Sequence, residues 1–333
     1  MTKTIQTIGI LGAGAWGTAL AQAAASAGRD VIIQAIEADV VESINTAHEN
    51  RLFLPAIPLS DRIRATTDIT EAVSNVDAVL AVTPAQFLRA TLEAAAKDWN
   101  GAVPIILCSK GIEQNTGLLM SEIAAQTVKG APVLVLSGPT FAGEVARGLP
   151  TGAVLAGENL GLVAKIADAI GTQTFRLYHA TDIIGAEIGG AVKNVMAVAC
   201  GIVEGRKLGD NARATLITRG LAEIVRLAEA RGGRAETLMG LSGLGDLVLT
   251  CNAMQSRNFS FGVEIGRGRT AAEVESERQT VAEGVHTAAA TVMLAKKLNV
   301  DMPIVSAVDG VLNHKIDLDA AIAGLLSRPV GEE

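Results

Sequence analysis

The sequence predicts an α/β protein whose first half is a doubly wound sheet and whose second half is all-helical. Three observations support this prediction. A glycine-rich turn follows the first apolar run, apolar runs and helical stretches then alternate, and from about Ala180 only helical stretches follow. With 333 residues the chain is long enough for two domains. We expect them at residues 1–182 and 183–333.

The first strand and helix are joined by a glycine motif. An apolar run at residues 8–11 leads into Gly12-Ala13-Gly14-Ala15-Trp16-Gly17, and a helical stretch follows. In G-x-G-x-x-G the first glycine permits a tight turn, the second lets a pyrophosphate approach the backbone, and the third lets helix and strand pack closely. The helix N-terminus favours the phosphates. The motif therefore predicts a Rossmann-like dinucleotide site; a glycine turn that binds no nucleotide is the alternative.

The second strand supplies the context that this motif requires. An apolar run at residues 31–34 follows the helix expected at 18–26, and Glu37 comes twenty residues after Gly17. A carboxylate at that place accepts a hydrogen bond from the ribose 2′-hydroxyl of NAD and repels the 2′-phosphate of NADP. We therefore expect NAD or NADP as cofactor, with a preference for NAD.

The later strands predict where the ligands bind. Ligands of parallel sheets lie beyond the carboxyl ends of the strands, so we expect Thr83, Pro84 and Lys110 at that edge. The segment SGPTFAGEVARGLPT, residues 137–151, offers backbone N–H groups to a ligand or is an ordinary turn. The further strands are expected at Ile63–Thr66, Ala78–Thr83, Pro104–Ser109 and Val133–Ser137, with helices between them that include Ala85–Ala96 and Gly117–Thr127.

The second half contains a lysine inside an apolar helical stretch. Residues 183–203 are small and apolar apart from Glu187, Lys193 and Asn194, so they predict a buried helix that links the domains rather than a membrane span. An ammonium buried there is costly unless it is paired or loses its proton. The other helices are expected at Ala212–Arg231, Arg257–Gly266, His286–Leu298 and Leu318–Leu326.

Two interpretations of Lys193 are open. A lysine on an apolar helix usually extends its ammonium to solvent. Beside a nicotinamide cofactor, a desolvated lysine with a lowered pKa would accept the hydroxyl proton when a secondary alcohol is oxidised, and would return it in the reverse reaction. Asp246, which stands among apolar residues, is either a helix N-cap or the partner of such a cation. The four histidines lie in no comparable constellation.

A second polar cluster consists of Ser256, Arg257 and Asn258, which are consecutive at an expected helix start. A hydroxyl, a guanidinium and an amide at a helix N-terminus suit a phosphate group. A solvated capping cluster is the alternative.

Composition excludes several classes of function. The formal net charge of −7 argues against a nucleic-acid surface, and no basic block suggests membrane docking. The three cysteines have no metal-like spacing. The N-terminal run that imitates a signal peptide is explained by the glycine motif. We therefore expect a cytoplasmic protein with reduced thiols and no metal.

The chain resembles the bacterial type of NAD(P)-dependent glycerol-3-phosphate dehydrogenase along essentially its whole length. The resemblance rests, in order, on GAGAWGTALA, SKGIE, SGPTFAGE, GGAVKNV, NARATLITRGLAE, GLGDLVLTC and QSRN. Only the first of these motifs is shared widely among dinucleotide enzymes. The resemblance implies interconversion of sn-glycerol 3-phosphate and dihydroxyacetone phosphate by hydride transfer, which supplies phospholipid synthesis.

The resemblance also implies roles for residues of this chain. Lys193 would be the proton acceptor, with Asp246 as the second catalytic residue. The implied substrate contacts are Lys110, Gly138, Thr140, Asn194, Asp246, Thr250, Ser256, Arg257 and Asn258. The implied cofactor contacts are Gly12, Gly14, Ala15, Trp16, Gly17, Ile36, Lys110, Ala142, Arg257, Val281 and Glu283.

Two other functions are weighed against this one. Dehydrogenases of 3-hydroxy acids or of 6-phosphogluconate also combine a nucleotide domain with a helical domain and a central lysine, but the QSRN and GLGDLVLTC motifs favour glycerol 3-phosphate. A non-catalytic redox sensor would keep the glycine turn without needing Lys193, Lys110 and Asp246 together. As partners we expect a small phosphorylated substrate and, from the alanine-rich helices of the second half, a second copy in a homodimer.

Overall fold

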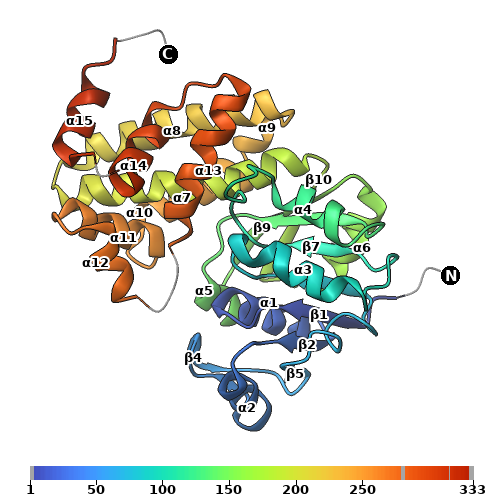
Figure 1. The fold of residues 1–333 in the computed structure, drawn as a ribbon. Helices are drawn as coiled ribbons and strands as arrows, with labels where there is room; N and C mark the ends of the chain where they lie inside the picture. The colour runs from blue at the N-terminus through green and yellow to red at the C-terminus, as the bar shows by residue number, and fades with distance from the viewer. Residues whose placement is uncertain (1–3, 279–281, 315, 330–333) are drawn as a thin grey trace. The chain divides into compact units, whose positions relative to one another are not determined.

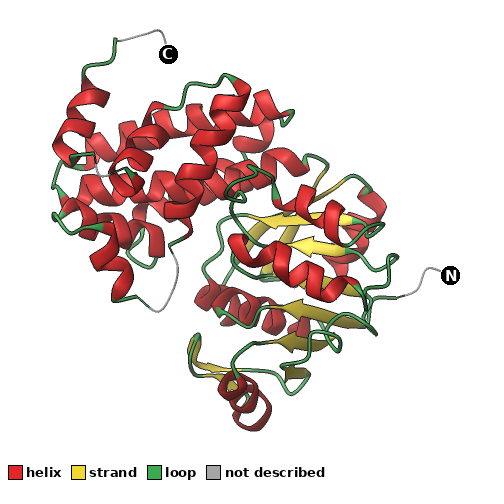
Figure 2. Cartoon of the chain, viewed as in Figure 1, coloured by secondary structure: helices red, strands yellow, loops and turns green. Residues whose placement is uncertain are grey.

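The computed structural model describes residues 4–278, 282–314 and 316–329, which form two compact units. Unit 1 comprises Met1–Lys110 and Leu119–Glu187, and unit 2 comprises Gly111–Leu118 and Ile188–Glu333. Every strand of the described residues belongs to unit 1, whereas unit 2 is helical (Figures 1 and 2). The α/β half followed by an all-α half is therefore confirmed. The division between the units falls inside a helix, a few residues beyond the expected residue 182.

Unit 1 is built on an eight-stranded sheet with the order β10-β9-β8-β7-β6-β1-β2-β5. From β1 the chain moves outward to β2 and β5 on one side and to β6, β7 and β8 on the other, which is the doubly wound arrangement. These strands pair in parallel. The strands of the sheet are β1 (Thr7–Leu11), β2 (Asp30–Gln34), β5 (Ile63–Thr66), β6 (Ala78–Ala81), β7 (Ile105–Leu107), β8 (Val133–Ser137), β9 (Thr151–Gly157) and β10 (Phe175–Ala180).

One strand pair departs from the parallel sheet that the sequence predicts. β9 runs antiparallel to β8, and β10 is parallel to β9. A parallel crossover needs a helix that carries the chain back along the strand. The connection from β8 to β9 contains only α5 (Ala142–Ala146), whose five residues span about 8 Å, whereas the five residues of β8 span about 17 Å. The chain therefore reverses its direction here.

The helices of unit 1 pack on the sheet in two groups, α1 beside α5 and α6, and α3 beside α4. α1 begins three residues before the expected start, because Gly14 already acts as its N-cap. α4 begins after Gly117, whose φ of +72° is incompatible with a right-handed helix. A separate hairpin is formed by β3 (Glu49–Asn50) and β4 (Leu54–Pro58). The remaining helices of this unit are α1 (Ala15–Ser26), α2 (Ala38–Ala47), η1 (Ala85–Phe87), α3 (Leu88–Ala96), α4 (Met120–Thr127) and α6 (Leu160–Ile170).

Unit 2 is organised around α7 (Ile183–Gly205), which begins in unit 1. Among the described residues, α7 alone is long and apolar enough to cross a membrane, but 89% of its most apolar window is buried inside the protein. This burial supports its prediction as a core helix. The other elements are α8 (Asp210–Arg231), α9 (Ala235–Leu238), the π-helical turn η2 (Leu241–Gly245), α10 (Asp246–Asn252), α11 (Arg257–Gly266), α12 (Ala271–Ser276), α13 (Glu283–Leu298), α14 (Pro303–Asn313) and α15 (Leu318–Leu326).

Four glycines let α7 and α11 pack with their backbones in contact. Gly201 and Gly205 of α7 face Gly262 and Gly266 of α11, each pair spaced by one helical turn. A Cβ at Gly262 would lie 2.1 Å from the Val198 carbonyl oxygen, which no larger residue could tolerate without a shift of the helices. We call these four glycines the glycine seam. The seam sets the distance between α7, which carries Lys193 and Asn194, and α11, which carries Asn258.

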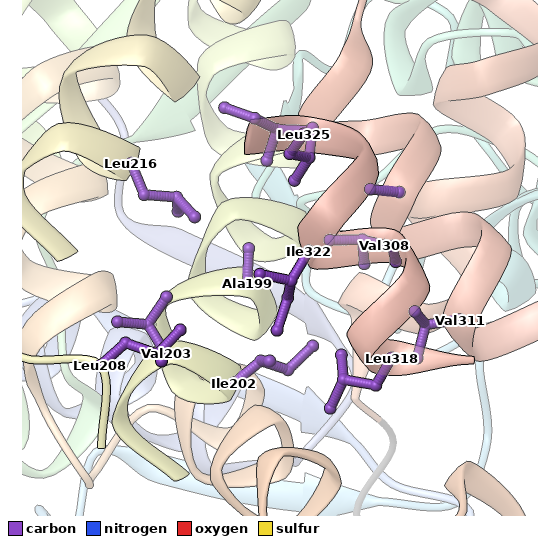
Figure 3. Close-up of a pocket in the computed structure, with 13 residues that line it drawn as sticks. Ala199, Ile202, Val203, Leu208, Leu216, Val308, Val311, Leu318, Ile322 and Leu325 are labelled. Atoms are coloured by element: carbon purple, nitrogen blue, oxygen red, sulfur yellow. The ribbon is translucent and has the colours of Figure 1, made fainter. Parts of the chain in front are cut away.

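An apolar groove lies within unit 2 between α15 and the helices α7, α8 and α14 (Figure 3). Its walls include Leu216, Val308, Ile322 and Leu325. None of the residues of α15 is buried although most of them are apolar, and Leu326 is 82% exposed. The C-terminal helix therefore presents apolar side chains that the described residues leave exposed.

Candidate active site

The glycine turn of unit 1 forms a cradle that leads directly into α1. Gly12 has a φ of +104° and its N–H donates to the Gln34 carbonyl oxygen at 3.1 Å, which ties the turn to β2. A Cβ at Gly17 would lie 1.9 Å from the Gly12 carbonyl oxygen, so the helix starts directly against the turn. A Cβ at Gly14 would meet nothing within 4 Å. No side chain caps the first turn of α1, so its N–H groups fit a pyrophosphate.

Two further features lie near this cradle in the chain. Trp16 follows in the first turn of α1 and packs edge-to-face on Phe175, with ring centroids 6.5 Å apart, while its buried Nε1 has no hydrogen-bond partner among the described residues. Beyond β2, Ile36 is 87% exposed and Glu37 is the N-cap residue of α2. A bound dinucleotide would require a polar atom that is still without a partner, such as Trp16 Nε1, and an exposed edge, such as that at Ile36.

The carboxyl ends of β7 and β8 meet through Lys110 and Gly138. Lys110 Nζ donates to the Gly138 carbonyl oxygen at 2.9 Å, and Thr140 Oγ1 donates to the same oxygen at 3.2 Å. A Cβ at Gly138 would lie 2.9 Å from Ala153 Cα, so this position needs glycine. Ala142 begins α5 directly after this turn. The structure thus brings together the residues that the SKG and SGPT motifs single out.

Lys193 of α7 is buried in unit 2 together with Asp246 and Thr250 of α10, with exposed fractions of 7%, 1% and 4%. Lys193 Nζ donates to Asp246 Oδ1 at 2.5 Å and to Thr250 Oγ1 at 2.8 Å. Thr250 Oγ1 in turn donates to the Asp246 carbonyl oxygen at 2.6 Å. The sequence leaves two roles open for Asp246, a helix N-cap or the partner of a buried cation. In the structure Asp246 is the partner of a buried cation. The alternative in which Lys193 extends to solvent is wrong.

The cysteines supply no nucleophile to this cluster. Cys251 follows Thr250 in α10, and its thiol contacts the thiol of Cys200 on α7. Burial and this neighbour raise the pKa of Cys251, and burial raises that of Cys108. Protonated thiols are inert as nucleophiles and metal ligands. Among the described residues, no group of three or more His, Cys, Asp or Glu side chains is placed to hold a metal ion.

Ser256, Arg257 and Asn258 lie at the start of α11. Ser256 is its N-cap, and its hydroxyl accepts from the Phe259 N–H at 3.2 Å. Arg257 is exposed at the first helical position. Asn258 is buried, with its Nδ2 donating to Asn194 Oδ1 at 3.0 Å, so that it joins α11 to the residue after Lys193. The glycine seam brings α11 close enough for this bond. The three residues combine a capped helix N-terminus with an accessible guanidinium.

Comparison with known proteins decides the family. The family model described as NAD-dependent glycerol-3-phosphate dehydrogenase N-terminus matches residues 7–163, and the corresponding C-terminus model matches residues 182–323. The chain belongs to this family. The glycerol-3-phosphate dehydrogenases of Parvibaculum lavamentivorans and Rhodospirillum rubrum, both named for NAD(P)+, are 55% and 54% identical to the chain over its full length, covering 100% and 95% of the relatives.

A solved structure agrees with the fold. The glycerol-3-phosphate dehydrogenase of Coxiella burnetii superposes with a TM-score of 0.93 at 37% identity, covering 97% of this chain and 99% of that one. The resemblance that the sequence motifs carry is thereby confirmed. As a member of a family of NAD-dependent dehydrogenases, the chain is an NAD(P)-dependent oxidoreductase.

The predicted residues of this family member fall into separate groups. Lys110, Gly138 and Thr140 form one group in unit 1, whereas Lys193, Asp246 and Thr250 form another in unit 2. Of the remaining predicted cofactor contacts, Glu283 is the first residue of α13, and Val281 lies outside the described residues.

One residue in direct contact with the glycine turn was not predicted from the sequence. Asn50, in the β3–β4 hairpin, donates to the Ala13 carbonyl oxygen at 2.8 Å. An asparagine in the polar stretch HENR gives no signal in sequence. Its burial becomes evident only from the fold.

Proposed function

We propose that this chain interconverts sn-glycerol 3-phosphate and dihydroxyacetone phosphate with NAD(P). The observation that carries the proposal is the buried pair of Lys193 and Asp246. Burying two charges in a helical core costs more free energy than their attraction usually returns, so an ion pair is poor as a purely structural device. A buried, paired lysine is instead typical of a catalytic site. We infer the reaction in which this lysine takes part from membership of the family.

The reaction transfers a hydride and a proton to different acceptors. Oxidation of the secondary alcohol breaks the C2–H bond and the O–H bond, and the cofactor, when bound, accepts the hydride. Lys193, as the neutral amine, takes the hydroxyl proton, and in the reverse direction its ammonium returns a proton to the carbonyl oxygen. Asp246 Oδ1 and Thr250 Oγ1 hold Nζ in a fixed position for both transfers. The Asp246 carboxylate also stabilises the ammonium that forms.

The substrate phosphate is assigned to the start of α11. The Arg257 guanidinium is exposed there and can form two parallel hydrogen bonds with phosphate oxygens. The helix N-terminus adds a favourable dipole. The full set of residues that we assign to the substrate is Lys110, Gly138, Thr140, Asn194, Asp246, Thr250, Ser256, Arg257 and Asn258.

The cofactor is assigned to the cradle at the start of α1. The exposed Glu37, directly after β2, supports NAD over NADP because its carboxylate would repel a 2′-phosphate. No metal enters this assignment. The residues that we assign to the cofactor are Gly12, Gly14, Ala15, Trp16, Gly17, Ile36, Lys110, Ala142, Arg257, Val281 and Glu283.

The test is reduction of dihydroxyacetone phosphate by the purified protein, followed as loss of NADH or NADPH absorbance. We expect turnover with NADH to exceed that with NADPH at equal concentration. Dihydroxyacetone, which lacks the phosphate, is the control substrate, and comparable rates with both would overturn the phosphate assignment. Activity on a 3-hydroxy acid or on 6-phosphogluconate would identify a different dehydrogenase. Binding of NADH without any turnover would identify a redox sensor.

For the assembly and the cell we propose a homodimer in the cytoplasm that supplies glycerol 3-phosphate for phospholipid synthesis. The apolar side chains of α15 support the dimer, because a second copy would cover them. Leu326→Glu places a charge on this surface and should convert a dimer to a monomer in light scattering after gel filtration. A wild-type protein that elutes as a monomer would reject the dimer.

A further inference from the structure

The turn that would hold the pyrophosphate is itself held by a residue from another part of unit 1. Asn50 lies 37 positions after Ala13 in the chain and has no exposed surface. Its Nδ2 donates to the Ala13 carbonyl oxygen at 2.8 Å and to Thr18 Oγ1 at 2.8 Å. The Thr18 hydroxyl donates to the same carbonyl oxygen at 3.3 Å. The carbonyl between Gly12 and Gly14 is thus engaged from two sides.

The contacts use both donors and one acceptor position of the asparagine amide. Both donors of Nδ2 are occupied, and Oδ1 accepts from the Phe53 N–H at 3.0 Å. An aspartate could not donate, and an apolar side chain could neither donate nor accept. Because an unpaired buried polar group is costly, the site is matched to asparagine.

The hairpin that carries Asn50 is anchored in the core. Leu54 and Ile57 of β4 are 6% and 8% exposed and belong to the hydrophobic cluster of unit 1. Glu49 Oε1 accepts from the Ala56 N–H at 2.8 Å, which closes the hairpin. The strand segment that ends at Asn50 is therefore fixed on both sides, so the amide has one position relative to the turn.

We propose that Asn50 is a positioning residue for the pyrophosphate of the dinucleotide. This inference rests on the proposed function, because it requires that the turn binds a cofactor. A carbonyl oxygen carries partial negative charge, and one left free in a phosphate-binding turn would repel the ligand. Asn50 and Thr18 hold the Ala13 carbonyl away from the ligand, so that the N–H groups at the start of α1 face it. Asn50 acts through the turn and does not touch the cofactor.

The test measures binding of NADH and of ADP-ribose by calorimetry. ADP-ribose contains the pyrophosphate but lacks the nicotinamide, so a loss of affinity for it cannot arise at the nicotinamide. Asn50→Leu, which keeps the branched skeleton of the side chain, should raise both dissociation constants by roughly tenfold or more, since the Ala13 carbonyl loses its shorter hydrogen bond. In steady-state assays the KM for NADH should rise while kcat changes less than about twofold.

Asn45→Leu is the matched control. Asn45 of α2 bridges to the backbone in the same way, donating to the Ala65 carbonyl oxygen at 2.9 Å and accepting from the Ala65 N–H at 2.8 Å, but Ala65 lies in β5. This control should lose stability with dissociation constants unchanged. Thr18→Val removes one hydroxyl from the same carbonyl and should raise both dissociation constants about threefold in a folded protein.

The outcomes separate the two proposals. A wild-type protein that binds neither NADH nor ADP-ribose overturns the proposed function. A wild-type protein that binds both, with unchanged affinities in folded Asn50→Leu and Thr18→Val, overturns the role of Asn50 alone. Equal loss of affinity in Asn50→Leu and Asn45→Leu would reduce that role to general stability and would also overturn it.

Discussion

Glu223 of α8 should make the stability of unit 2 depend on pH. Its carboxyl group is 1% exposed and accepts from the N–H groups of Ile304 at 2.7 Å and Val305 at 3.2 Å, in the first turn of α14. Burial raises the pKa of Glu223 from 4.5 to about 7, although the two backbone bonds and Arg226 oppose the shift. Removing the charge by Glu223→Gln is the perturbation that isolates this group.

The sign and size of the effect follow from proton linkage. Between pH 4.5 and pH 7 the folded chain holds a proton on Glu223 that the unfolded chain has released. The free energy of unfolding therefore falls as the pH rises, because the folded state binds more protons in this window. At about 1.36 kcal/mol for each pH unit, the difference between 4.5 and about 7 gives a loss of about 3 kcal/mol, complete slightly above pH 7.

The assay is urea unfolding of the wild type and of Glu223→Gln at several pH values between 4 and 8. Both tryptophans, Trp16 and Trp99, lie in unit 1, whereas unit 2 is helical. Circular dichroism at a helix wavelength reports mainly on unit 2, which holds most of α7 together with α8 and α13, and tryptophan fluorescence reports on unit 1 as an internal control. Other carboxylates and histidines titrate in both proteins and cancel in the difference.

The expected difference between variant and wild type changes by about 3 kcal/mol across this range, in favour of the variant at high pH. Asp301 and its ion-pair partner Arg328 are retained in both proteins, so their contribution also cancels. A difference that stays constant from pH 4 to pH 8 would refute the reasoning. It would mean that folding does not change the pKa of Glu223.

Three further predictions concern catalysis and packing. Lys193→Met should lower kcat at least about a hundredfold with an unchanged dissociation constant for NADH; near-normal kcat would reject Lys193 as the proton acceptor. Arg257→Ala should lower kcat/KM for dihydroxyacetone phosphate by about 2–4 kcal/mol and that for dihydroxyacetone much less, and equal losses would reject the phosphate contact. Gly262→Ala should cost about 1–3 kcal/mol of unfolding free energy, because its Cβ would lie 2.1 Å from the Val198 carbonyl oxygen. Gly324→Ala on α15, whose Cβ would meet nothing within 4 Å, is its control and should cost nothing.

The parallel strands could be predicted because they are short apolar runs bounded by polar residues. β5 and β8 have the predicted bounds, as do α11 and α15. β9 and β10 were not predicted as elements, and the reversal at β9 could not be inferred, because an apolar run such as TGAVLAG carries no direction. Direction depends on the length of the connecting helix, which in α5 is only five residues.

The polar residues likewise divide into those that could be predicted from the sequence and those that could not. Lys193 could be singled out because one charge in an apolar stretch requires an explanation, and Asp246 because it is the acid in a second such stretch. Asn50 could not, since it lies among other polar residues in the sequence. Glu223 could not, since Arg219 and Arg226 stand at helical spacing from it, as on the exposed face of a helix. Their burial arises from the positions of the β3–β4 hairpin and of α14. Sequence thus reveals a polar residue that contrasts with its neighbours in the chain, but not one that contrasts only with its surroundings in the fold.

The glycine seam connects helix packing with the residues proposed to bind the substrate. Asn258 lies one helical turn before Gly262, and its bond to Asn194 spans 3.0 Å. An alanine in the seam must push α11 away from α7, which lengthens this bond and displaces Arg257 at the start of the same helix. Gly262→Ala should therefore raise the KM for dihydroxyacetone phosphate more than the KM for NADH, because Asn194 and Asn258 are assigned to the substrate alone. Equal changes in both constants would show that the helix pair does not position the substrate residues.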